Sequence, residues 1–258
     1  MADSRSVETT FRIAASPEDV FRALTEASEL TNWFPTIAES DPQKGGVVSM
    51  SWGENWASGD GVFTEFDPPH RVCIRHEGAF GAFPTVQEWT ITQDGGETVL
   101  DLVHSGFSAG ADGDEDYDSV RTGWAFELAG LKHYLERHKG TKREVIVRHL
   151  PIGCSQAEAC HALLGGTPPA VGEPFSLALP GYGTLEGTVR VNNAPRDFAA
   201  IIPGVNHAYF RCIAEACGGP MAATLWLSCY GVDQHTMSAI SGGFERLLAD
   251  KLESVAAE

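Results

Sequence analysis

Basic residues are scarce in this sequence. The chain has 18 Lys and Arg against 35 Asp and Glu, which gives a formal net charge of -17. Binding to a phosphate backbone needs clustered Lys and Arg that displace counterions, so nucleic acid is excluded as a partner. The deficit lies in residues 1–140, with 10 basic and 24 acidic residues, against 8 and 11 in residues 141–258. We take this acidic surplus to indicate a soluble surface.

Long apolar runs are also missing. No stretch approaches the roughly eighteen apolar residues that a membrane-spanning helix needs. Met1 is not followed by a charged and then apolar leader of the kind that directs secretion. We therefore expect a soluble, cytoplasmic protein with no membrane span.

The cysteine pattern does not indicate a metal or redox site. None of the six cysteines forms a Cys-x-x-Cys pair, and we expect reduced thiols that pack as small apolar residues. Cys160 and His161, close to Cys154, come nearest to a metal-binding set. Helical periodicity places adjacent residues on different faces, so we expect no metal and no cofactor.

One long amphipathic helix is predicted between Val120 and His138. An acidic run, residues 112–118, precedes it, and basic residues followed by Gly140 end it, as the helix dipole favours. At 1.5 Å per residue the helix is roughly 28 Å long, enough to cross a small sheet. Its apolar residues recur in steps of three and four and are Val120, Trp124, Leu128, Leu131 and Leu135.

Strand-like runs bounded by turns precede this helix. Strands in succession with short links predict an antiparallel sheet, with the long helix on one face. Ser16 and Pro17 mark the start of a first small helix, and residues 26–33 suggest a second. In the last strand Leu100, Leu102 and His104 share the face expected to look toward the long helix. The predicted strands are residues 8–14, 47–52, 61–66, 71–77, 85–92 and 98–104.

The same pattern recurs after Gly140, in the same order. Residues 155–164 align with 16–24, 187–196 with 61–70, and 224–231 with 99–106. Apolar residues between Met237 and Leu252 then form a second terminal helix. Ordered self-similarity of this kind predicts two copies of one fold. The second copy is shorter, because it lacks about a dozen residues that hold the small helix at Trp33 and the hairpin at Trp52.

Several phrases of the first copy carry a family resemblance. They are Ser16-Pro-Glu-Asp-Val-Phe21, Leu30-Thr-Asn-Trp33, Gly45-Gly46, residues 59–71, residues 98–107 and Gly123-Trp124. Together they resemble the START-like (SRPBCC) superfamily with the birch-pollen-allergen fold, and within it the homologues of the heat-shock ATPase activator C-terminal domain. The resemblance implies an α+β fold of two tandem helix-grip domains, each a curved antiparallel sheet wrapped around a long C-terminal helix. We expect a START-like domain with an apolar cavity at 1–140 and a shortened, divergent one at 141–258.

The resemblance also implies a range of functions. In many members the space under the helix binds lipids, polyketides or other hydrophobic molecules, and in some branches it hosts cyclase or dehydratase chemistry. In the chaperone-linked branch, tied to stress response, the domain contacts a protein partner. Cys229 stands where the first copy has His104, and Trp33 has no counterpart, so we expect any ligand in the first copy.

Aromatic residues are concentrated in the first copy, which has five of the six tryptophans. Large rings with a polar edge suit a concave site for a flat apolar ligand, although they equally suit a filled core. The candidate ligand-binding residues are Trp33, Trp52, Phe63, Phe83, Trp89, His104, Trp124 and Leu128.

His104 is the best titratable candidate, either as an acid or base or as a histidine bonded within the wall. Glu65 and Glu88 are the carboxylates considered as its partners. No Ser-His-Asp order, phosphate-binding loop or metal set accompanies it. We therefore predict binding of a small hydrophobic ligand without evident catalysis. In this hypothesis the second copy serves mainly as a packing or homodimer surface. The alternatives are a chaperone-associated interaction module and a cyclase or dehydratase that uses His104.

Overall fold

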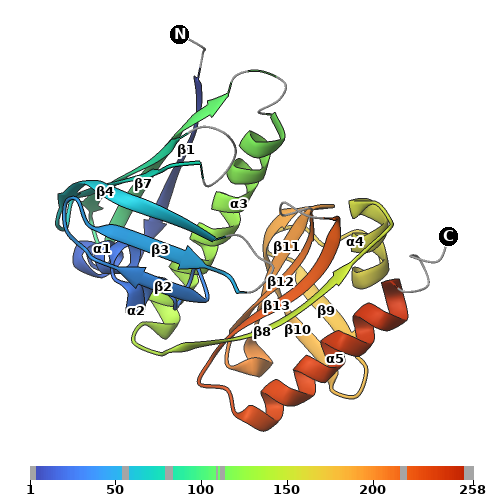
Figure 1. Ribbon diagram of the computed structural model, residues 1–258. Coiled ribbons are helices and arrows are strands. Elements are labelled where there is room, and N and C mark those ends of the chain that lie inside the picture. The colour runs from blue at the N-terminus through green and yellow to red at the C-terminus, as the bar shows by residue number, and fades with distance from the viewer. Residues whose placement is uncertain are drawn as a thin grey trace. The chain divides into compact units, whose positions relative to one another are not determined.

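The computed structural model describes residues 4–53, 58–78, 84–108, 110, 114–215 and 220–252. The chain divides into two compact units, Met1–Gly140 and Thr141–Glu258, called here the first and the second unit (Figure 1). Each has its own antiparallel sheet and its own long helix, so the predicted α+β class and the tandem helix-grip architecture are confirmed.

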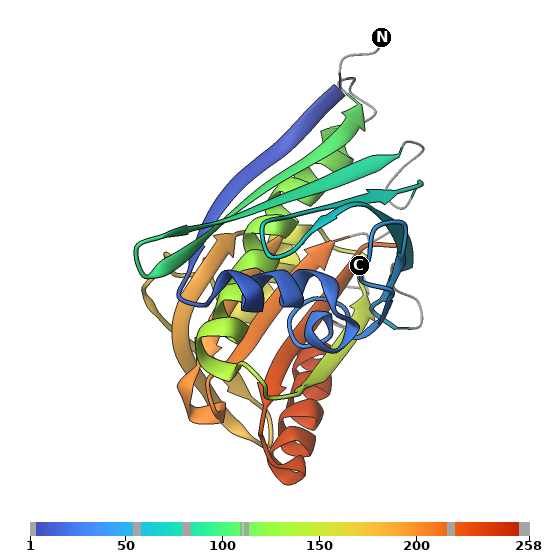
Figure 2. The same ribbon diagram turned by 90° about the vertical axis from the view of Figure 1, so that its left-hand side faces the viewer.

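The first unit has a seven-stranded sheet in the order β1-β7-β6-β5-β4-β3-β2. The long helix α3 runs along one face of this sheet, and α1 and α2 lie together at one end of the unit (Figure 2). The strands are β1 Ser4–Ile13, β2 Ile37–Ser40, β3 Val47–Ser51, β4 Ser58–Asp67, β5 Arg71–His76, β6 Thr85–Asp94 and β7 Glu97–Ser108. The helices are α1 Pro17–Thr25, α2 Ala27–Leu30 and α3 Asp114–His133, which continues as a π-helical turn, η2, over Tyr134–His138.

The local sequence explains where these elements begin and which faces they bury. The side chain of Ser16 accepts a hydrogen bond from the backbone N–H of Asp19 and caps α1, as predicted. Burial alternates along β7, where Leu100, Leu102 and His104 are each no more than 1% exposed. The strand therefore turns the expected face toward the interior.

The long helix differs from its prediction at both ends. It begins at Asp114 instead of Val120, so that Asp118 lies within its first turns. Carboxylates there are stabilised by the free N–H groups and the dipole of the helix N-terminus. At the other end five residues form a π-helical turn. The predicted apolar face is confirmed from Trp124 to Leu135, whereas Val120 is only half-buried.

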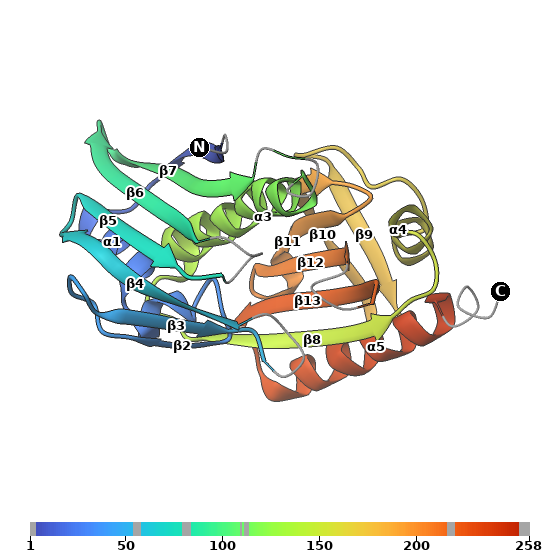
Figure 3. The same ribbon diagram turned by 45° about the horizontal axis from the view of Figure 1, so that its top comes forward.

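The second unit repeats this plan with six strands in the order β8-β13-β12-β11-β10-β9 (Figure 3). Its terminal helix α5 contacts both edge strands, β8 and β9. The elements are β8 Arg143–Pro151, α4 Gln156–Leu164, β9 Pro174–Leu179, β10 Gly183–Asn193, β11 Asp197–Ile202, the short 3-10 helix η3 Pro203–Val205, β12 Ala208–Glu215, β13 Ala222–Tyr230 and α5 Gln234–Leu252.

The sequence echoes fall on equivalent elements. Helix α4 follows the first strand of its unit as α1 does, β10 corresponds to β4, and β13 pairs with β8 as β7 pairs with β1. The chain runs from α4 directly to β9, so the second unit has no counterpart of α2 and β2. The predicted loss of the hairpin at Trp52 is wrong, because β9 pairs with β10 as β3 pairs with β4. None of the helices in the described part of the chain is long and apolar enough to span a membrane.

Candidate functional site

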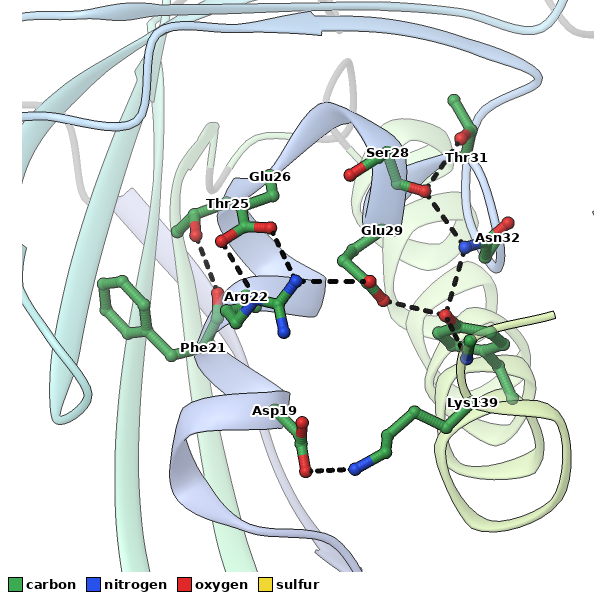
Figure 4. A network of polar contacts seen from close by, with 12 residues as sticks. Asp19, Phe21, Arg22, Thr25, Glu26, Ser28, Glu29, Thr31, Asn32 and Lys139 are labelled. Atoms are coloured by element: carbon green, nitrogen blue, oxygen red, sulfur yellow. Dashed lines mark hydrogen bonds and ion pairs between the residues drawn. The ribbon is translucent and has the colours of Figure 1, made fainter. Parts of the chain in front are cut away.

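One end of the first unit is closed by a polar network that joins the two small helices to the end of α3 (Figure 4). The phenol oxygen of Tyr134, in η2, donates to Glu29 at 2.8 Å and accepts from the side-chain amide of Asn32 at 3.0 Å. Lys139 forms an ion pair with Asp19 at 2.7 Å. The network holds α2, and with it the segment that follows, against the long helix.

That segment brings aromatic rings to the centre of the unit. Trp33 is buried, and its indole N–H donates to the backbone oxygen of Ala23 at 2.8 Å, while its ring stacks on Phe34 at 5.0 Å. Phe34 in turn lies 5.6 Å from the ring centroid of Trp124 on α3, and 5.0 Å from that of Trp52. Phe34 thus connects the closed end to the helix.

Trp124 is the centre of this aromatic set. Its ring also makes an edge contact with Trp89 of β6 at 5.1 Å. Its indole N–H donates a 2.9 Å hydrogen bond to Nδ1 of His104 on β7. The His104 ring lies 4.9 Å from Phe107, which a bulge at Gly106 returns to the inner face. Helix and sheet are therefore joined in the interior by one hydrogen bond inside a cluster of rings.

Polar groups without partners lie on the same inner face. Nε2 of His104, Nε2 of His76 and Oγ1 of Thr85 are buried and have no hydrogen-bond partner among the described residues. His76 and Thr85 face each other across β5 and β6, and Gln87, 4% exposed, faces His104 across β6 and β7. Buried polar atoms are seldom left unpaired in folded proteins, so this part of the inner face marks a candidate binding site.

Burial keeps both imidazoles neutral. It lowers the pKa of His104 to about 3, with a further contribution from the nearby His76, and it also lowers the pKa of His76. Because an indole N–H can only donate, Nδ1 of His104 must be the unprotonated acceptor, and the proton of the neutral ring is on Nε2. His104 therefore offers the interior a hydrogen-bond donor and has no free lone pair for use as a general base.

The two carboxylates considered as partners of His104 lie elsewhere. Glu88 is on the opposite face of β6 from Trp89, and both Glu88 and Glu65 form ion pairs with Arg71, at 2.9 and 3.0 Å. Strand alternation alone does not predict which face of the sheet each glutamate occupies, and the structure places both on the outer face. The possibility that either glutamate acts with His104 as an acid–base pair is therefore wrong.

The structure brings together only some of the predicted residues. The ring of Trp124 contacts both Trp89 and His104, and Leu128 is buried one turn further along α3. Trp33 and Trp52 join them through Phe34. Phe63 belongs to a separate group of rings beside α1, where it contacts Phe66 at 5.5 Å. Phe83 lies outside the described residues.

Four residues of the site were not among the candidates. Phe34 stands beside a helix-ending proline and shows no periodicity. Thr85 and Gln87 alternate in phase with Trp89 along β6, so strand alternation predicts that they share its face of the sheet. His76 ends β5, and only the pairing of β5 with β6 brings it next to Thr85.

In the described part of the second unit, the core cluster is built of apolar residues together with Cys212 and Cys229. Cys229, at the position that corresponds to His104, is fully buried, and burial raises the pKa of its thiol to about 12. Within the described parts of both units, no group of three or more His, Cys, Asp or Glu is arranged to hold a metal ion.

The model of the family described as "Activator of Hsp90 ATPase homolog 1-like protein" matches residues 14–136. None of the curated proteins matches the sequence.

Three solved structures illustrate the similarity. The Aha1 dimer from Colwellia psychrerythraea is 25% identical over 53% of this chain and 99% of its own, with a TM-score of 0.46. DynU16, from the dynemicin biosynthetic locus, is 17% identical over 97% of both chains, with a TM-score of 0.45. The di-domain ARO/CYC BexL from the BE-7585A biosynthetic pathway is 14% identical over 98% of this chain and 99% of its own, with a TM-score of 0.48. The family match lies within the first unit and covers slightly less than half of the chain, so the first unit is similar to domains of the activator of Hsp90 ATPase homolog 1-like family.

Proposed function

We propose that the first unit binds a small, predominantly apolar molecule between α3 and its sheet, at Trp124, Trp89 and His104. The observation that supports this most strongly is the set of unpaired polar atoms at His76, Thr85 and His104 beside those rings. A buried polar group without a partner costs about 1–3 kcal/mol, which a bound molecule with its own polar atom would recover. Apolar sites with a few convergent polar groups are typical of small-molecule binding.

The test uses toluene as an apolar probe and the whole chain as the protein. Binding raises the midpoint of thermal unfolding as toluene exceeds its dissociation constant. In NMR spectra we expect the indole N–H signals of Trp124 and Trp89 to shift on titration. Trp226, in β13 of the second unit, is the internal control, and its signal should stay in place. Toluene near saturation that changes neither the unfolding midpoint nor these signals would refute the proposal.

The family match supports a second candidate function, contact with an Hsp90-type chaperone through the first unit. The strong acidic surplus of residues 1–140 favours an electrostatic contact with a basic surface. The prediction is binding to purified Hsp90 that weakens as salt is raised. Binding that is absent at low salt would remove this candidate.

A cyclase or dehydratase that uses His104 as its base is less compatible with the site. In the neutral tautomer the only nitrogen of His104 that faces the interior already carries a proton. The ring is suited to orienting a bound oxygen atom by hydrogen bonding. Hydrogen bonding to a ligand oxygen therefore requires no change in the tautomer of His104.

A further inference from the structure

The two histidines of the site present opposite hydrogen-bonding groups. His104 receives the indole N–H of Trp124 at Nδ1, so its Nε2 carries the proton and is a donor. His76 is the reverse case. Its Nδ1 lies 3.1 Å from the backbone oxygen of Asp60, and a carbonyl oxygen only accepts. We therefore assign the proton of His76 to Nδ1, which leaves Nε2 as an acceptor with a free lone pair.

These two groups lie on one face of the sheet. His76 is on β5 and His104 on β7, with Thr85 and Gln87 of β6 between them. Strands two places apart are separated by roughly 10 Å. The two rings are close enough that His76 contributes to the lowered pKa of His104. Gly61 opposite His76 makes room for its ring, because a Cβ there would lie 2.7 Å from the ring carbon Cε1.

The buried surroundings carry no formal charge, because among the buried polar residues of the described part of the first unit there is no Lys, Arg, Asp or Glu. The titratable neighbour of His104 is His76, whereas His76 has the carboxylate of Asp60 nearby, which acts to raise its pKa. Burial outweighs that carboxylate and keeps both imidazoles neutral. A carboxylate would have no counter-charge here, and its oxygens could not donate to His76. A carbonyl or ether oxygen would accept from His104 but would leave the His76 lone pair unpaired.

We propose that the molecule bound in the first unit carries a hydroxyl group, which accepts a hydrogen bond from Nε2–H of His104 and donates one to Nε2 of His76. This inference rests on the proposed function and specifies its ligand class as an apolar alcohol or phenol. Oγ1 of Thr85, the cross-strand neighbour of His76, is the third polar atom available to the same hydroxyl. A water molecule is the competing occupant, and the experiment below separates the two.

The first measurement concerns the tautomers and needs no ligand. Ring nitrogen shifts of histidine-labelled protein distinguish a protonated Nδ1 from a protonated Nε2. We expect the Nε2–H form for His104 and the Nδ1–H form for His76. The same tautomer in both rings would overturn the proposal, because the pair would then lack either the donor or the acceptor.

The second measurement compares phenol, anisole and toluene, which have similar volumes but different polar groups. Phenol both donates and accepts, anisole only accepts, and toluene does neither. We expect phenol to bind about tenfold more tightly than the other two, the effect of a single buried hydrogen bond. In His76→Phe, phenol and anisole should bind equally while toluene is unaffected. His70→Phe, at an exposed position, is the matched control and should keep the preference.

The outcomes distinguish this inference from the proposed function. Equal binding of all three probes to the unsubstituted chain would overturn the hydroxyl inference, leave ligand binding intact and assign the polar atoms to water. Failure of all three to bind would overturn both. Since the comparison of phenol with anisole is made on the unsubstituted chain, the test remains decisive if His76→Phe does not fold.

Discussion

The indole N–H of Trp124 on α3 donates a 2.9 Å hydrogen bond to Nδ1 of His104 on β7. The bond links helix to sheet in the interior, and it also selects the tautomer of the imidazole. One contact thus has a structural effect and a chemical effect.

Trp124→Phe keeps an aromatic ring but removes the donor, and leaves Nδ1 of His104 buried and unpaired. We expect the free energy of unfolding to fall by about 1–3 kcal/mol, measured by denaturant titration. Trp52→Phe is the matched control, since Trp52 is only half-buried and its ring makes an edge contact with Phe34. Its loss should stay below about 1 kcal/mol. Equal losses in the two variants would contradict a special role for the bond.

The lowered pKa of His104 predicts a dependence of stability on pH. Below its ordinary pKa of about 6.5 the unfolded chain binds a proton that the folded chain excludes, so stability is greatest above pH 6.5 and is lost as pH falls toward 3. Between about pH 7 and pH 5 this one group should account for a loss of about 2 kcal/mol.

His104→Gln provides the measurement. Glutamine does not titrate and still has an oxygen that accepts from Trp124. Unfolding followed by tryptophan fluorescence should show a shallower fall between about pH 7 and pH 5 in this variant than in the parent. Parallel curves would mean that His104 is protonated alike in both states.

Tyr134→Phe should weaken the closed end of the first unit. The hydroxyl bonds to Glu29, Asn32 and the backbone N–H of Gly140, and the residue is fully buried. We expect a loss of about 1–3 kcal/mol in unfolding free energy. Lys139→Ala removes the neighbouring ion pair with Asp19, whose lysine is half exposed, and should cost at most about 1 kcal/mol. The reverse order of these two losses would show that the ion pair holds the end together.

The interior of the second unit predicts a difference in thiol reactivity. Burial raises the pKa of Cys229 to about 12 and also raises that of Cys212, so neither forms a thiolate near pH 8. Peptide mapping after alkylation of the native protein should find both unmodified. Cys154 is only half-buried and should react before Cys212 and Cys229. Modification of Cys229 at the rate of Cys154 would show that this interior opens readily.

Much of the fold could be predicted because it depends on local rules. Period-two alternation identified the inner face of β7, and steps of three and four identified the buried side of α3 from Trp124 onward. The start of α3 was missed because Asp has a low intrinsic helix propensity. In the folded unit that deficit is offset where Asp114 pairs with Arg5 of β1 at 2.6 Å, a contact distant in sequence.

The candidate site was only partly predictable for the same reason. The sequence by itself determined that the first unit holds five of the six tryptophans, that His104 faces inward with Leu102, and that the second unit has Cys229 in its place. Only the tertiary structure decided that Trp124 is the donor to His104, that Glu65 and Glu88 face outward, and that His76 and Thr85 complete the polar group. Those outcomes depend on which strands are neighbours and on where the helix crosses them, because hydrogen bonds act over about 3 Å whereas the residues that form them are tens of positions apart in the chain.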